Sequence, residues 1–222
     1  MRFYRVSSLK SDVLKAIALV CLADGLVGIS YGSLAHSYGF PLWVPLSLSL
    51  LVLAGASEFI FISMVAGGAS PLAAAAAGML VNARHLPFGI AVRDLVGCGQ
   101  RSWLGCHIMN DESVVFGLAQ SSPSQRKAAY WLCGIGIALC WPLGVLLGTS
   151  LGQLIPDTNA IGLDAVFPAI LLALIFSALK KLSTLISASA GALIALASVP
   201  LLPVGMPVLF SLLGLLVRRR QQ

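Results

Sequence analysis

Long apolar stretches separated by short polar breaks fill most of this 222-residue chain. A helix needs about 20 largely apolar residues to cross a lipid bilayer. Stretches near that length lie at residues 13–33, 42–66, 71–92, 103–119, 128–152, 162–179, 183–199 and 201–217. They predict an all-α, polytopic membrane protein with about eight spans, built as a single transmembrane domain over residues 1–222.

Residues typical of turns mark the breaks, and prolines lie inside some of the stretches. Clusters of Ser, Gly, Pro, Asp and Asn occur at 37–41, 67–71, 121–124 and 156–159. Pro87, Pro142 and Pro168 lie within apolar stretches, where proline kinks or breaks a helix and frees a carbonyl. In lipid, protein or cavity water must satisfy such carbonyls. We therefore expect some of the spans to be kinked or broken.

Glycines at a spacing of four residues predict where helices pack closely. Gly28 and Gly32 lie in the first stretch, and Gly144, Gly148 and Gly152 lie in the fifth. Residues four apart share one face of a helix, and small residues on that face let two backbones approach each other. We expect these two faces to be helix-packing surfaces.

The composition agrees with a membrane protein and excludes several other classes. Hydrophobic residues make up 58% of the chain and charged residues 10%, whereas soluble domains carry about 25% charged residues. A soluble enzyme, a disordered chain and a fibrous repeat are therefore excluded. The five cysteines include no C-x-x-C pair, so they indicate neither a disulfide framework nor a zinc site. No metal or cofactor is expected.

The net charge of +6 is explained by membrane topology. Lys and Arg accumulate in cytoplasmic loops, and no basic patch with interleaved aromatic residues indicates nucleic acid as a partner. With eight spans and a cytoplasmic N-terminus, eleven of the 14 Lys and Arg residues face the cytoplasm, while Arg93 and Arg101 face outside and Arg84 lies within a span. Without the fourth span, the later basic clusters would face outside. The charges therefore favour eight spans with both termini cytoplasmic.

Polar residues inside the predicted spans form the candidate site. A charged group at the centre of a membrane helix costs about 2.5–3.5 kcal/mol, so we expect these groups to face one interior cavity rather than lipid. The candidate residues are Asp24, Glu58, Asn82, Arg84, His85, Asn110, Asp111 and Glu112. The alternative for an individual residue is a place at a helix end, for example Asp24 as the cap of a half-helix.

Arg84 keeps its proton at any physiological pH, so it requires a carboxylate or carbonyl partner. One or two acids at most can pair with it, and the remaining acids are candidates to carry protons. His107 and Asp111 are four residues apart, which favours a hydrogen-bonded pair on one helix face. A metal site is disfavoured because no second pair of ligands is evident.

Short motifs at four places carry a resemblance to a known family. They are Ala23-Asp24-Gly25 with Tyr31-Gly32, L-A-G-A-S-E-F at 53–59, V-N-A-R-H at 81–85 and N-D-E-S at 110–113. Together they resemble the AzlC family of bacterial branched-chain amino acid permeases, and weaker similarity covers 134–152 and 162–179. The family commonly has Gln at the position of Glu58 and Thr at the position of Asn110.

The resemblance implies an exporter of valine, leucine and isoleucine, with methionine as a further candidate. It also implies a bacterial inner-membrane location and a small AzlD-type membrane subunit as partner. Arg84 or a half-helix N-terminus would bind the substrate carboxylate, and Glu58 or Asp111 would bind its ammonium group. Since the chain has no Walker A pattern, protons are the expected energy source, with Glu58 or Asp111 as the first candidate carrier.

Two alternatives remain open at the level of the sequence. The first is a transporter or channel for another small solute, which would keep the acids and change the pocket. The second is a membrane-embedded hydrolase, suggested by G-x-S-x-G at 148–152. A nucleophile elbow needs a strand–turn–helix context, whereas this motif ends a long apolar stretch. An enzyme is therefore not expected.

Overall fold

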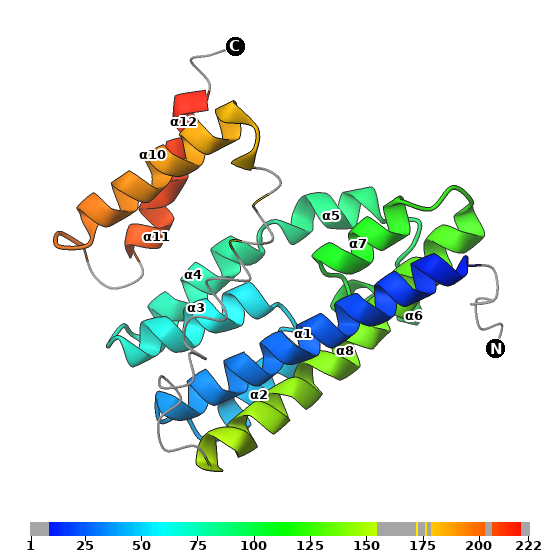
Figure 1. The fold of residues 1–222 in the computed structure, drawn as a ribbon, viewed down its shortest axis with the longest axis horizontal. Helices are drawn as coiled ribbons and strands as arrows, with labels where there is room; N and C mark the ends of the chain where they lie inside the picture. Colours follow the sequence, from blue (N-terminus) through cyan, green and yellow to red (C-terminus); the bar gives the residue numbers. More distant parts are fainter. Residues whose placement is uncertain (1–8, 155–171, 173–175, 177–178, 203–205, 219–222) are drawn as a thin grey trace.

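The computed structural model describes residues 9–154, 172, 176, 179–202 and 206–218, and every regular element within these residues is helical (Figure 1). The elements are α1 (Ser11–Ser37), α2 (Trp43–Leu51), α3 (Gly55–Ala66), α4 (Pro71–Asn82), α5 (His85–Ala91), α6 (Gln100–His107), α7 (Asp111–Leu118), α8 (Pro123–Leu154), α10 (Leu182–Ser198), α11 (Met206–Phe210), the 3-10 helix η2 (Ser211–Leu213) and α12 (Gly214–Arg218). The all-α prediction is confirmed for the described part of the chain.

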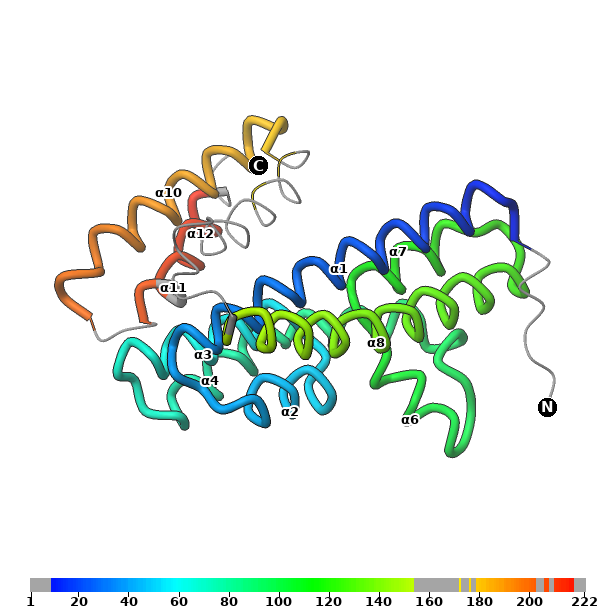
Figure 2. Tube along the Cα trace, turned by 60° about the horizontal axis from the view of Figure 1, so that its bottom comes forward, coloured from blue at the N-terminus to red at the C-terminus, as the bar shows by residue number. Residues whose placement is uncertain are grey.

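Helices α1 and α8 lie side by side along most of their length, as both ribbon and tube show (Figures 1 and 2). A Cβ atom built on Gly144 would collide with the carbonyl oxygen of Gly25, and one built on Gly148 would collide with that of Ile29. Hydrogen bonds cross the same interface, since Ser33 Oγ donates to the Gly148 carbonyl at 2.8 Å. The predicted glycine packing faces are confirmed, and they pack against each other.

These two helices are also the ones that are individually long and apolar enough to cross a membrane, among the residues described. While α1 buries Gly28 and Gly32, it exposes Leu19, Leu22 and Leu26 by 63% to 67%. A row of exposed leucines on a long helix suits contact with lipid better than contact with water.

Three of the predicted spans consist of two short helices each. Residues 42–66 form α2 and α3 with a break at 52–54, residues 71–92 form α4 and α5 with a break at 83–84, and residues 103–119 contain α7 and most of α6 with a break at 108–110. The general expectation of broken helices is confirmed, and one break lies near Pro87 as expected, but breaks at 52–54 and 108–110 were not predicted.

Two of the three breaks have a local physical cause. In a continuous helix the Pro87 ring would clash with the carbonyl of Ala83, four residues earlier; because the chain breaks at 83–84, Pro87 lies in the first turn of α5, where proline is tolerated. At the third break Asn110 and Ser113 form a capping box that starts α7. At the first break Leu53 adopts a positive φ of 51°, a costly conformation for a bulky residue.

Pro142 behaves differently from Pro87. It lies inside α8, which continues as one helix of 32 residues, so no break occurs there. The segments on both sides of Pro142 pack on α1, with Gly144 against Gly25 on one side. Packing of this kind maintains a helix around a proline when neighbouring groups satisfy the freed carbonyl. Pro168 lies outside the described residues.

The C-terminal region is described only in part. α10 matches the predicted span 183–199, and it packs against α11, η2 and α12, which together occupy the region predicted as the last span. A Cβ built on Gly214 would lie 2.5 Å from the Ser187 carbonyl oxygen, so this packing is again close. Most of the predicted span 162–179 lies outside the described residues. The number of spans remains a prediction.

Candidate functional site

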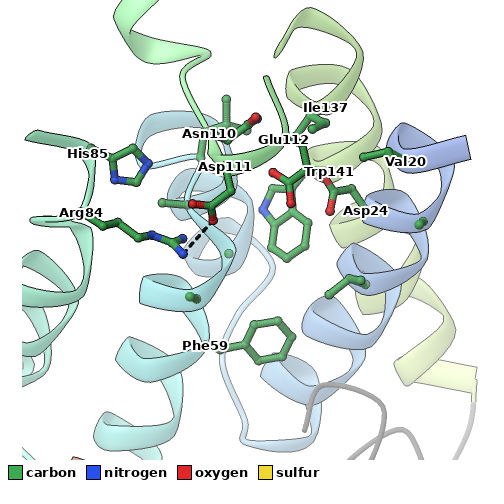
Figure 3. Close-up of a pocket in the computed structure, with 16 residues that line it drawn as sticks. Val20, Asp24, Phe59, Arg84, His85, Asn110, Asp111, Glu112, Ile137 and Trp141 are labelled. Carbon is green, nitrogen blue, oxygen red and sulfur yellow. Dashed lines mark ion pairs between the residues drawn. The ribbon is translucent and has the colours of Figure 1, made fainter. Parts of the chain in front are cut away.

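A cavity of about 290 Å³ lies where the three helix breaks meet the middle of α1 and α8 (Figure 3). Its walls come from the start of α3, the α4–α5 break, the start of α7 and the central turns of the two long helices. Asp24 lines the cavity and is the central residue of the 27-residue helix α1. The cavity is therefore halfway along one of the two described helices that are long and apolar enough to cross a membrane.

Arg84 and Asp111 form an ion pair in this cavity, with 2.7 Å between Arg84 Nη1 and Asp111 Oδ2 (Figure 3). The α4–α5 break positions the arginine, and the first turn of α7 positions the carboxylate. The predicted requirement of Arg84 for a carboxylate partner is met. Its Nε atom is buried and has no hydrogen-bond partner among the described residues.

Asn110 is both a helix cap and a lining residue of the cavity. Its side-chain Oδ1 accepts a hydrogen bond from the backbone N–H of Ser113 at 2.8 Å, and the backbone N–H of Asn110 donates to Ser113 Oγ at 3.0 Å. The residue is only 8% exposed, and its Nδ2 has no partner within the described chain. Asn110 thus leaves one unused donor beside the Arg84–Asp111 pair.

Glu58 lies behind the cavity wall instead of lining it. It is 1% exposed, and its two carboxylate oxygens accept hydrogen bonds from the Ala54 amide at 2.9 Å and from Trp141 Nε1 at 3.1 Å. Ala54 and Trp141 themselves line the cavity. The expectation that Glu58 faces the cavity is therefore wrong, because the helix break at 52–54 turns its carboxylate toward these two donors.

Asp24 and Glu112 contribute the remaining acids of the cavity. Figure 3 shows their carboxyl groups near one another on the side away from Arg84, and the two groups interact electrostatically. Asp24 lies within the continuous helix α1 and Glu112 in the first turn of α7. The alternative that Asp24 caps a half-helix is wrong, because α1 is unbroken through that position.

Apolar side chains complete the walls. They come from the two long helices and from α3 with its preceding break: Val20, Val27, Leu53, Phe59, Ile137 and Trp141. Tyr31 packs behind this wall against the rings of Phe59 and Trp141, with centroid separations of 5.0 Å and 5.8 Å. The cavity therefore combines a charged side with an apolar side.

A second cavity of about 240 Å³ adjoins the first and shares Ala54 and His85 with it. Asn82 lines this second cavity and donates from Nδ2 to Ser57 Oγ at 3.0 Å. The ring of His85 is oriented by a 3.0 Å contact between its Nδ1 and the backbone carbonyl oxygen of Asn82. Asn82 is therefore separated from the acids, and His85 borders both spaces.

The predicted pairing of His107 with Asp111 is wrong. The break at 108–110 separates the two residues, His107 Nε2 lies 2.9 Å from the Leu50 carbonyl, and Asp111 binds Arg84. Within the described residues, no cluster of three or more His, Cys, Asp or Glu side chains has a geometry for a metal ion.

Trp141 is a site residue that sequence reasoning missed. It lines the cavity, and its indole donates to Glu58 from a position inside α8. An indole N–H in an apolar span needs a hydrogen-bond partner, and this requirement was the signal available from the sequence.

Comparison with known proteins adds evidence on the family of the chain. A family model described as "AzlC protein" matches residues 19–155, a segment that contains every residue lining the two cavities. The Bacillus subtilis branched-chain amino acid transport protein AzlC is 28% identical over 201 residues, which cover 88% of this chain and 79% of that protein.

Two further relatives are membrane proteins. The Escherichia coli inner membrane protein YgaZ is 25% identical over 169 residues, or 72% of this chain and 69% of that protein. An uncharacterised membrane protein of Haemophilus influenzae is 25% identical over 134 residues, or 59% of this chain and 55% of that protein. No solved structure matches this chain.

Proposed function

Since the chain belongs to the AzlC protein family, we propose that it transports branched-chain amino acids across the inner membrane of a bacterial cell. Its family and named relatives make it a membrane transport protein and not an enzyme. The observation that carries the choice of substrate is the cavity, whose donors, acids and apolar wall match the three parts of such an amino acid.

Arg84 and Asn110 supply the part of the cavity that suits the substrate carboxylate. Arg84 Nε and Asn110 Nδ2 are buried donors without a partner in the described part of the chain. A buried donor without an acceptor costs about 1–3 kcal/mol, and a substrate carboxylate that accepted a hydrogen bond from either donor would remove part of that cost. The preference of carboxylates for arginine supports the same orientation.

The other two parts of the substrate face the remaining walls. The ammonium group suits the acidic side formed by Asp24 and Glu112, and the branched side chain suits the apolar side formed by Val27, Phe59 and Ile137. Sites for small molecules typically measure about 300–1,000 Å³. A cavity of about 290 Å³ lies just below that range and favours a single small solute.

We also propose that transport proceeds as proton-coupled export and requires a small AzlD-type membrane subunit. The family resemblance supports the subunit and the direction. The acids of the cavity outnumber its one permanent cation, Arg84, which supports proton coupling. In this proposal residues 1–222 act as one transmembrane domain with both termini cytoplasmic, as the distribution of Lys and Arg favours.

Efflux from intact cells tests the substrate. Cells that express the chain with its partner are loaded with valine-containing or leucine-containing dipeptides, and the free amino acid released to the medium is measured. Efflux of branched-chain amino acids should exceed that of alanine or glutamate. Arg84→Ala should abolish efflux, and Arg93→Ala, an exposed arginine outside the cavity, should leave it unchanged. Equal efflux of all four amino acids would favour a transporter or channel for other solutes.

Reconstitution tests the subunit. The purified chain in vesicles is compared with the chain plus a small AzlD-type protein, using an inward or an outward pH gradient. We expect gradient-driven transport only with both proteins present. Robust transport by the chain alone would contradict the two-component proposal without affecting the choice of substrate.

A further inference from the structure

The four acids around the central cavity do not have equal surroundings. Asp111 is bound to Arg84 at 2.7 Å. Glu58 accepts two hydrogen bonds from Ala54 and Trp141, and it is shielded from the cavity by these two residues. Both carboxylates therefore have fixed partners that stabilise their charge. Neither is free to exchange its partner for a substrate.

Asp24 and Glu112 have no such partner from another residue. Both line the cavity, neither forms an ion pair within the described residues, and the Glu112 carboxyl group accepts a hydrogen bond only from its own backbone amide. The two groups face each other from different helices, Asp24 from the middle of α1 and Glu112 from the first turn of α7 (Figure 3). Arg84 is ion-paired with Asp111 and acts on Glu112 only electrostatically, so no cation is bound directly to Asp24 or Glu112 among the described residues.

The rest of the cavity indicates which kind of ligand Asp24 and Glu112 would bind. Asn110 lines the same cavity, is 8% exposed and keeps an Nδ2 that has no partner within the described residues. That donor requires an acceptor, while Asp24 and Glu112 require a cation or a proton. A ligand that carries both an acceptor and a cationic group satisfies all three residues at once.

We propose that Asp24 and Glu112 form one exchange site that holds a shared proton when the cavity is empty and a substrate ammonium group when it is filled. Two carboxylates close together in a poorly hydrated cavity do not both ionise readily, and they titrate as a pair. When a protonated amine enters, both carboxyl groups become carboxylates that accept its N–H bonds, and the shared proton leaves as H⁺. One positive charge replaces another, so the charge of the site is conserved.

The inference changes the assignment of the proton carrier from Glu58 or Asp111 to the Asp24–Glu112 pair. The exchange of the proton for an ammonium group rests on the proposed amino acid substrate, whereas the proton shared by Asp24 and Glu112 does not. Other titratable or charged groups around the pair are Arg84, His85, Glu58, Asp111, Cys21 and Cys133. A test must therefore separate the pair from these neighbours.

The first experiment needs no substrate. Infrared difference spectra of the full chain in lipid vesicles are recorded over a pH titration, and the C=O stretching band of protonated carboxyl groups is followed. Asp24→Asn and Glu112→Gln should each remove or shift the band that titrates. Asp24→Glu keeps a carboxyl group and should retain it. Asp12→Asn, an exposed acid on the same helix, is the matched control and should leave the band of Asp24 and Glu112 in place.

A titrating band that survives both Asp24→Asn and Glu112→Gln and disappears in Glu58→Gln or Asp111→Asn would overturn the inference. The retained band of Asp24→Glu shows that loss of the band in Asp24→Asn reflects loss of the carboxyl group and not failure to fold.

The second experiment adds valine. Calorimetric titration in buffers of different ionisation enthalpy should show about one proton released for each valine bound. Asp24→Asn should abolish the release and weaken binding roughly 10- to 100-fold, as expected for loss of a charge-assisted hydrogen bond. If the variants change the infrared band and valine does not bind, the proton shared by Asp24 and Glu112 is supported and the proposed substrate is wrong. If valine binds to the unmodified chain without proton release, the exchange is overturned.

Discussion

Glu58 presents two acceptor oxygens to two donors that come from different helices. The Ala54 amide belongs to the break before α3, and the Trp141 indole belongs to α8. Glutamine offers one acceptor oxygen and one NH₂ group, so Glu58→Gln would leave one of the two donors facing another donor. We expect the variant to lose roughly 1–3 kcal/mol of stability, measured by thermal unfolding in detergent.

A double-mutant cycle with Trp141→Phe identifies the contact responsible. Because Phe has no N–H group, Glu58→Gln should cost less in the Trp141→Phe background than in the unmodified chain. Equal costs in both backgrounds would show that the Trp141–Glu58 hydrogen bond does not account for the loss.

Asp111 holds Arg84 in position, and this determines what its removal should do. Asp111→Asn removes the charge that anchors the guanidinium at 2.7 Å and leaves Arg84 free to rotate away from the cavity. We expect KM for the amino acid to rise roughly tenfold, the effect of about 1.4 kcal/mol, while the proton-driven component of transport persists. The measurement is transport with and without a pH gradient, and loss of only the gradient-driven part would contradict this role.

Individual residues show which parts of the site could be predicted from the sequence. Charged groups in apolar stretches must gather away from lipid, and this argument correctly brings Asp24, Arg84, Asp111 and Glu112 together. It does not reveal which acid pairs with which donor. Glu58 turns away from the cavity because of the conformation at 52–54, a tertiary feature that no spacing in the sequence encodes.

At the scale of the helix, the α1–α8 contact depends on glycines that tolerate no side chain. A Cβ on Gly148 would collide with the Ile29 carbonyl oxygen, a backbone atom that cannot move independently. Gly148→Ala should cost roughly 1–3 kcal/mol of stability by overpacking, measured by unfolding in mixed detergent micelles. Gly89→Ala is the matched control, because its new Cβ would meet only Met109 Cε at 3.9 Å. Equal losses in both variants would contradict the packing argument.

The helix breaks differ in how far they can be predicted from the sequence. Pro87 signals the break at 83–84, whereas the capping box of Asn110 and Ser113 at the start of α7 departs from the usual S/T-x-x-E/Q signature and is seen only in the structure. The break at 52–54 contains neither proline nor glycine. It is stabilised by the contact of Glu58 with Trp141, 83 positions away in the chain, so only the folded structure reveals it.

For the whole molecule, the topology gives a further test. Eleven Lys and Arg residues lie on the predicted cytoplasmic side and two on the other, which predicts a cytoplasmic C-terminus. A reporter that is active only outside the cytoplasm, fused after Gln222, should give no signal. The same reporter fused next to Arg93 should be active. A strong signal at Gln222 would exclude the eight-span arrangement.

The position of Asp24 at the centre of α1 also has an electrical consequence. If α1 crosses the bilayer, a proton that reaches Asp24 from either face traverses about half of the membrane potential. One elementary charge crossing the full potential involves about 2.3 kcal/mol per 100 mV, so half the path involves roughly 1 kcal/mol. A zwitterionic amino acid carries no net charge and does no such work. Each exchange of one proton for one amino acid would therefore be electrogenic, and membrane voltage alone would drive it.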